Sequence, residues 1–162
     1  MDNYNQISSF IWNVCDDVLR GLFKPHEYGD VILPFTVLRR LDCTLESHKD
    51  EVYEIYEKYK SQVDDPTPII LNKINTNFFN HSKYDLTRLK SDPQNINLNF
   101  QNYIGGYSDN VVEIIENFQF DKPVQKLHKS NRLYQLIDKF TEVDLHPDVI
   151  SNRDMGIIFE EL

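Results

Sequence analysis

Four basic side chains lie close together in the last third of the chain, with no acidic residue between them. Lys122, Lys126, Lys129 and Arg132 recur at about one helical turn, with His128 among them. On a helix, cations at this spacing could each contact one phosphate of a nucleic-acid backbone. We therefore predict phosphate contact for this cluster. Two alternatives stay open, because short basic runs are usually only solvated and because an acidic partner subunit could also meet this one.

The sequence offers no comparable group of residues for catalysis or ligand binding. Asp16 and Asp17 are adjacent, but neighbouring helical positions point about 100° apart and no histidine is close in sequence, so we expect surface acids. Gly105-Gly106 belongs to no phosphate-binding glycine motif and is interpreted as a helix end. His81 has no further ligand at metal-binding spacing. We therefore expect no catalytic, cofactor-binding or metal-binding residue in this chain.

Composition and charge bound the class of protein. With 162 residues, 40% of them hydrophobic, the chain can form one domain with a real core. The formal net charge of -9 argues against a freestanding DNA-coating protein, although it leaves room for a local basic face. No apolar run approaches the roughly 20 residues that cross a bilayer, and no signal peptide is recognisable, so we expect a cytoplasmic protein without membrane contact. Cys15 and Cys43 are predicted to be buried free thiols.

Two helices are predicted at the start of the chain, where they would form a hairpin. Apolar residues recur every three or four positions over residues 7–22 and again over 31–45. We expect Ser8 or Ser9 to cap the first helix and Gly21 to end it, because glycine readily adopts the left-handed conformation.

We expect Asp30 to cap the second helix of the hairpin. Pro34 would then lie near the helix start, where a missing amide donor costs little. No glycine or proline interrupts the pattern between Leu41 and Pro66, so this helix is predicted to continue as one long or kinked helix.

Shorter helical units are predicted in the rest of the chain. They cover residues 68–74, 93–104, 108–118, 123–127 and 133–140, and a last unit is capped by Ser151 or Asn152. Residues 76–90 have no sustained period, and we expect an ordered irregular segment there in which a short strand pair could form. The predicted fold class is all-α, a multi-helix bundle built on the N-terminal helical hairpin.

Five short motifs follow one another in an order and spacing that resemble a known family. In chain order they are Ile11-Trp12, Leu19-Arg20-Gly21, Tyr28-Gly29-Asp30-Val31-Ile32-Leu33-Pro34, Leu38-Arg39-Arg40-Leu41 and Met155-Gly156-Ile157-Ile158-Phe159-Glu160-Glu161-Leu162. On these motifs the chain is similar to the N-terminal domain of the M (methyltransferase, HsdM) subunit of type I restriction-modification systems. The likeness is loosest over residues 66–102, which match no motif of that family.

The resemblance implies the N-terminal helical domain of a DNA adenine-N6 methyltransferase subunit that helps clamp DNA. The implied partners are the specificity (S) subunit, a second M subunit, in some systems a restriction (R) subunit, and duplex DNA. S-adenosylmethionine would be the cofactor of the parent enzyme and not of this chain, which has neither a Pro-Pro pair nor a Phe-x-Gly-x-Gly turn. Arg39 and Arg40 then join the basic cluster as candidate contacts to DNA or to another subunit.

The sequence ends on an apolar position of its last predicted helix, with no glycine or proline after it. We therefore expect residues 1–162 to be a single N-terminal domain of a longer protein, with the catalytic domain following. A second class of function stays open, a self-contained helical adaptor that binds protein partners and has no part in DNA chemistry. Methyltransferase motifs in the gene beyond Leu162 would favour the first class, and a stop codon there would favour the second.

Overall fold

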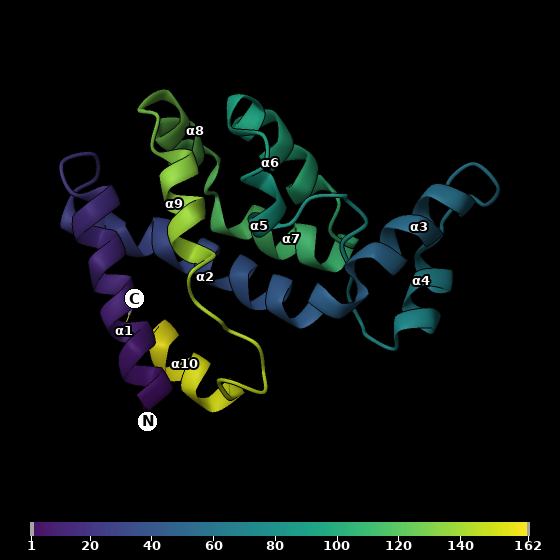
Figure 1. Cartoon of the computed structure of the whole chain (residues 1–162), viewed down its shortest axis with the longest axis horizontal. Helices are drawn as coiled ribbons and strands as arrows, with labels where there is room; N and C mark the ends of the chain where they lie inside the picture. The colour runs from purple at the N-terminus through teal and green to yellow at the C-terminus, as the bar shows by residue number, and fades with distance from the viewer. Residues whose placement is uncertain (1, 162) are drawn as a thin grey trace.

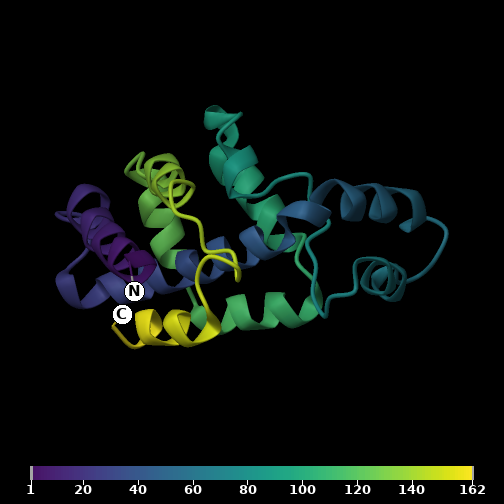
Figure 2. The same ribbon diagram turned by 60° about the horizontal axis from the view of Figure 1, so that its bottom comes forward.

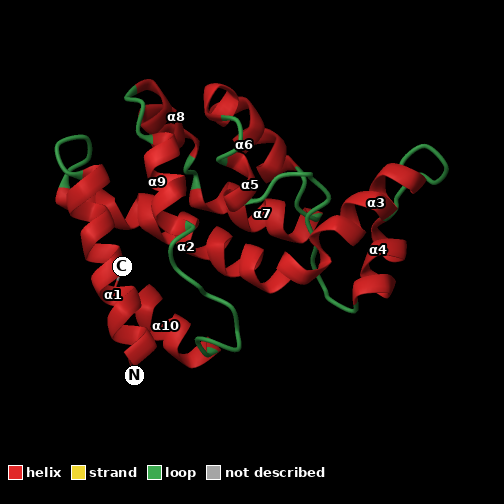
Figure 3. Ribbon diagram, viewed as in Figure 1, coloured by secondary structure: helices red, strands yellow, loops and turns green. Residues whose placement is uncertain are grey.

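The computed structural model describes residues 2–161 and the side chains from residue 5 to residue 160 (Figure 1). Helices and the loops between them make up all of this part of the chain, which contains no β-strand (Figure 3). The predicted all-α fold is confirmed. No helix within residues 2–161 is both long and apolar enough to cross a membrane.

The central element is helix α2, Tyr28–Leu45, against which most of the other helices pack (Figure 1). Phe35 of α2 is completely buried and contacts the rings of Phe100, Phe120 and Phe140 at centroid distances of 5.7, 6.0 and 5.8 Å. These three rings come from different parts of the second half of the chain. The core is therefore assembled around one face of the second helix of the predicted hairpin.

The first helix of the hairpin, α1, spans Asp2–Val14 and continues as a π-helical turn over Cys15–Leu19. Gly21 follows with φ +83°, so the predicted helix end at this glycine is confirmed. The predicted cap at Ser8 or Ser9 is wrong, because α1 begins six residues or more before these serines. Once a turn has formed, each further residue adds a backbone hydrogen bond, and the helix extends through the polar N-terminal residues that lack an apolar pattern.

The predicted cap at Asp30 is also wrong, because helical structure starts earlier, with a 3-10 turn over Pro25–Glu27. The Glu27 carboxylate accepts a 2.8 Å hydrogen bond from the backbone amide of Lys24. This bond gives a partner to an amide at the start of the turn that has none within the helix. Asp30 instead lies in the first turn of α2, where its charge favours the helix dipole. Pro34 is consequently inside the helix, and the carbonyl of Asp30 loses its usual amide partner.

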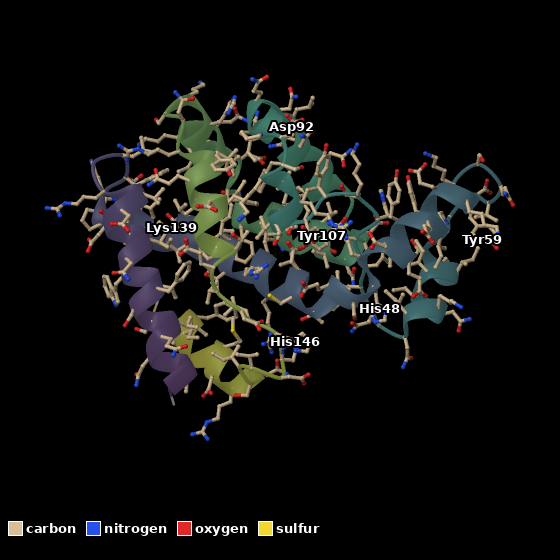
Figure 4. All side chains as sticks on the ribbon, in the orientation of Figure 1. His48, Tyr59, Asp92, Tyr107, Lys139 and His146 are labelled. Carbon is tan, nitrogen blue, oxygen red and sulfur yellow. The ribbon has the colours of Figure 1, made fainter. Side chains whose placement is uncertain are left out.

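A second hairpin projects from the body of the domain and consists of α3, Lys49–Tyr59, and α4, Thr67–Ile74 (Figures 1 and 2). A 3-10 turn over Glu46–His48 separates α2 from α3, which confirms the kinked form of the predicted long helix. Figure 4 shows His48 at the base of this hairpin and Tyr59 near its tip.

The remaining helices pack around α2, and α10 lies beside α1 (Figure 2). They are α5 (Leu86–Leu89), α6 (Ile96–Gly105), α7 (Asp109–Phe118), α8 (Asp121–Lys129), α9 (Leu133–Phe140) and α10 (Asn152–Glu161), with a 3-10 turn at Pro93–Asn95. The Ser151 hydroxyl accepts a 3.1 Å hydrogen bond from the amide of Asp154, which confirms the predicted cap of the last helix. Both cysteines are free and buried, as predicted.

The short strand pair considered for residues 76–90 does not form. Only an isolated antiparallel bridge joins Asn80 to Tyr107. Side chains bind the backbone amides that a second strand would need, since Asn80 accepts from the amide of Ser82 and Ser82 accepts from the amide of Tyr84. The segment is the ordered irregular stretch that the sequence predicts, with Phe79 and Leu86 buried in the core.

Candidate nucleic-acid interface

Three of the predicted basic residues form one exposed row on α8, which we call the lysine ridge: Lys122, Lys126 and Lys129. Val124 and Leu127 are buried on the opposite face of the same helix, and this burial fixes which side of α8 faces solvent. The ridge residues are spaced four and three positions apart, so their side chains emerge on successive turns along about 10 Å of helix. Such a row could contact consecutive phosphates of one strand.

A surface hollow lies alongside the lysine ridge and is lined in part by Leu22, Gln125 and Ser130. Lys126 is held in place by a cation–π interaction, because its Nζ lies 4.7 Å from the centroid of the Phe23 ring. Phe23 is itself buried, so the loop after the π-helical turn supplies a rigid support for this cation. The three ammonium groups of the ridge are therefore hydrogen-bond donors gathered at the edge of one hollow.

Two lysines of the ridge, Lys126 and Lys129, also have a local role in the helix that carries them. Lys126, His128 and Lys129 all lie in the last turn of α8, where positive charge is favourable for the helix dipole. Helix α8 ends at Lys129 with Ser130 as its C-cap, and Asn131 follows with φ +58°. Helix stability is thus sufficient to explain the positions of Lys126 and Lys129, but not that of Lys122 in the first turn, and contact with phosphate would be an additional role.

Arg132, the fourth residue of the predicted cluster, does not join the lysine ridge. Its guanidinium donates hydrogen bonds of 2.9 and 3.3 Å to the carbonyls of Val18 and Arg20, at the end of the π-helical turn. These carbonyls have no partner of their own within the turn, and Arg132 satisfies them. Nearby, Lys139 lies 3.5 Å from Asp17 of the same turn (Figure 4). Both contacts attach α9 and its N-terminal loop to the first helix.

Arg39 and Arg40 also donate hydrogen bonds within the domain. Both contact the segment between α9 and α10, residues 141–151, which we call the strap. Arg39 donates from Nε to the carbonyl of Val143 at 2.8 Å. Arg40 donates to the carbonyls of Leu145 and Ile150 at 2.8 and 2.7 Å and to the side chain of Asn152 at 2.7 Å. Their predicted contact with DNA or another subunit stays a prediction, and the structure gives them a structural role besides.

The sequence-based predictions missed a buried polar cluster around Asp42. One carboxylate oxygen of Asp42 accepts hydrogen bonds from the hydroxyls of Tyr103 and Tyr107 at 2.6 and 2.7 Å, and the other accepts from the amide of Leu86 at 2.8 Å. Burial raises the pKa of Asp42 to about 6, although these three donors act in the opposite direction. A signal was present, because Asp42 occupies a position of the apolar stripe of α2.

Lys49 is a second buried charge near this cluster. Its Nζ donates a 3.1 Å hydrogen bond to the side chain of Asn80, and burial lowers the pKa of Lys49 to about 8. Asp42 and the two tyrosines are enclosed by helices, so we assign the cluster a structural role. Within residues 2–161 no group of three or more His, Cys, Asp or Glu side chains could hold a metal ion.

Comparison with known proteins gave one match. A family model described as the HsdM N-terminal domain matches residues 7–140, which include the hairpin, the projecting α3 and α4, and the lysine ridge. No curated protein and no solved structure matches the chain.

Proposed function

Because the chain belongs to the HsdM N-terminal domain family, the N-terminal domains of the M subunits of type I restriction-modification systems, we propose that it holds duplex DNA without catalysing a reaction itself. In this proposal the domain helps to close the assembled complex around DNA and contacts the specificity subunit and a second M subunit. The lysine ridge supplies the contact with DNA, through the phosphate backbone and not through the bases.

The observation that carries this proposal is the lysine ridge itself. Three cations share one exposed helix face in a chain whose formal net charge is -9. Lysines that contact phosphates position a protein on DNA without reading its sequence. Contact with phosphates alone suits a subunit whose partner recognises the DNA sequence. Such contacts also make the affinity for DNA strongly dependent on salt.

We further propose that the methyl transfer takes place outside residues 1–162. S-adenosylmethionine would be the methyl donor, adenine N6 the acceptor, and the catalytic domain would follow Leu162 in the complete subunit. No group of residues in the cluster around Asp42 or on the lysine ridge resembles a binding site for that cofactor. Reading the gene beyond Leu162 for a Phe-x-Gly-x-Gly turn and an Asn-Pro-Pro-Tyr or Asp-Pro-Pro-Phe motif tests this part directly.

Duplex binding as a function of salt tests the role of the lysine ridge. The experiment uses the complete M subunit assembled with its specificity subunit and compares the native protein with a triple variant, Lys122→Gln, Lys126→Gln and Lys129→Gln. Each lost phosphate contact should reduce the slope of log K against log salt by about 0.9, so we expect the slope to fall by about 2 to 3.

A matched control uses three exposed lysines of the projecting hairpin and the loop after it, Lys58→Gln, Lys73→Gln and Lys83→Gln, which carry the same change in charge. This control should leave the slope unchanged. An unchanged slope in the ridge variant, or equal losses in both triple variants, would refute DNA contact by the ridge. Loss of assembly with the specificity subunit at an unchanged slope would instead identify the ridge as a subunit contact.

A further inference from the structure

A small pocket with mainly apolar lining residues opens where α1, the start of α2 and α10 meet, and it shares no lining residue with the hollow beside the lysine ridge. Its volume is about 150 Å³, and its lining includes Ile11, Trp12, Pro25, Tyr28 and Ile158. A cavity of this size is large enough for one benzene-sized group. The pocket is therefore suited to a single apolar side chain and is too small for a cofactor.

Trp12 forms one wall of this pocket and yet is 64% exposed to solvent. Large aromatic side chains that remain exposed beside a pocket are typical of the centres of protein interfaces, where tryptophan is strongly enriched. Ile157, on the neighbouring helix α10, is also partly exposed, at 37%. Helix α10 thus carries one residue that lines the pocket, Ile158, and one exposed apolar residue next to it in sequence.

The helices that line the pocket carry more exposed acidic side chains than exposed basic ones. Residues 5–19, which form α1 and the π-helical turn, contain no lysine or arginine, and the first two turns of α2 contain none either. Exposed acids on the three helices that line the pocket are Asp16 and Asp17, Asp30, and Glu160, against one exposed arginine, Arg153. The loop that supplies Pro25 adds the exposed cations Arg20 and Lys24, and Asp17 lies 3.5 Å from Lys139. Asp16 and Asp30 form no ion pair within the described residues, so these two carboxylates favour a cationic polypeptide over a phosphate backbone.

We propose that this pocket, which we call the Trp12 pocket, binds one leucine-sized or phenylalanine-sized side chain of a partner protein whose flanking residues are lysine or arginine. The apolar side chain fills the cavity against Trp12 and Ile158, and the cationic neighbours lie near Asp16 and Asp30. This surface is separate from the lysine ridge, and its role does not depend on whether the ridge contacts DNA.

The chain contains a single tryptophan, so the fluorescence of Trp12 reports directly on the pocket. The first probe is the synthetic peptide KKAALAAKK, which has no tryptophan, titrated into the chain at physiological salt. Two matched peptides replace the central Leu by Ala or all four Lys by Glu. We expect a blue shift of Trp12 emission with the Leu peptide, binding at least about tenfold weaker with the Ala peptide, and no shift with the Glu peptide.

Variants of the chain are compared by the anisotropy of a dye-labelled Leu peptide, because this readout does not need Trp12. Trp12→Ala should weaken binding by about tenfold or more and Asp16→Lys by several fold. Both residues are exposed, so neither change should impair folding. Leu98→Ala is the control, because Leu98 on α6 is 70% exposed and does not line the Trp12 pocket; it should bind as the native chain does.

Three results would overturn the proposal. The first is the absence of a Trp12 shift with the Leu peptide, and the second is equal affinity for the Leu and Ala peptides. The third is a dimer of the chain, detected by sedimentation, that Trp12→Ala dissociates, since the occupant would then be a second copy and not a cationic partner.

Discussion

The hydroxyl of Tyr103 donates a 2.6 Å hydrogen bond to the carboxylate of Asp42, which lies 61 positions earlier in the chain. Tyr107 donates to the same oxygen, and the two hydroxyls are 2.8 Å apart (Figure 4 labels Tyr107). A buried carboxylate is tolerated only when such donors replace its water. The contact therefore connects α2 to α6 and to the loop after it in a way that apolar packing alone would not specify.

Replacing Tyr103 by phenylalanine removes one of these donors and keeps the ring. Hydrogen bonds to charged groups are worth about 1.5 to 3 kcal/mol, so we expect Tyr103→Phe to lower the free energy of unfolding by this amount in urea titrations. Tyr134→Phe is the matched control, because Tyr134 is partly buried and its hydroxyl has no hydrogen bond within the described residues. Equal losses in both variants would show that the hydroxyl of Tyr103 does not matter.

The buried carboxylate of Asp42 should also make the free energy of unfolding fall as the pH rises, which is opposite to the usual effect of an acidic residue. The pKa of Asp42 is about 6 in the folded chain and 3.8 without the fold, so between these values the folded state holds the extra proton. Stability from this group is then greatest below about pH 4 and falls as the pH rises through 6, by up to about 3 kcal/mol. Lys49 titrates at about pH 8 or above and does not contribute in this window.

Comparison with Asp42→Asn isolates this effect from that of the other acids. We expect the difference in unfolding free energy between the native chain and Asp42→Asn to narrow between about pH 4 and pH 7, by about 2 to 3 kcal/mol. Urea titrations at closely spaced pH values measure it. A difference that stays constant over this range would mean that Asp42 keeps its ordinary pKa.

Local patterns predicted the helices well, because the apolar stripe from Ile7 to Val14 and the left-handed Gly21 depend only on neighbouring residues. The helix starts were harder to predict. Glu27 and Lys24 begin the second helix earlier than Asp30, and either arrangement satisfies the same local rules. Asp42 was missed because its donors lie 44 to 65 positions away. No local period encodes such partners.

The candidate interface could be predicted only in part, because some of its residues depend on local spacing and others on distant partners. The row of Lys122, Lys126 and Lys129 follows from helical spacing together with the burial of Leu127. Arg132 has the same chemistry, but it lies just beyond the end of α8, where carbonyls of a distant π-helical turn accept its hydrogen bonds. The contacts of Arg132 therefore depend on tertiary structure and could not be predicted from the local sequence. The helix face that carries the three lysines depends only on helical spacing and could be predicted.

Loss of the Arg40 side chain should release the strap. Arg40 donates to two strap carbonyls and to Asn152 at the start of α10, and these groups would lose their partner together. We expect Arg40→Ala to increase amide hydrogen exchange at least about tenfold over residues 141–152 and to leave α6 unchanged. Arg153→Ala removes the same charge from an exposed position and should not alter exchange in the strap. Equal exchange in the two variants would contradict the anchoring role.

Two adjacent glycines at the end of α6 should respond oppositely to the same change. A Cβ on Gly106 would lie 2.6 Å from the side-chain oxygen of Asn80 and 2.7 Å from the backbone nitrogen of Ser82, whereas one on Gly105 would meet nothing within 4 Å. Asn80 uses that oxygen to accept from Lys49 and from the amide of Ser82, so Gly106→Ala disturbs buried hydrogen bonds besides the packing.

We expect Gly106→Ala to lower the free energy of unfolding by about 1 to 3 kcal/mol, the usual cost of overpacking. Gly105→Ala should be neutral or stabilise the chain by up to about 1 kcal/mol, because alanine is the better helix former. Thermal unfolding of both variants measures the contrast. If the two variants unfold alike, the loop from Asn80 to Tyr84 can move away from α6 at little cost, and the side-chain hydrogen bonds that replace a strand pair there are weaker than their geometry indicates.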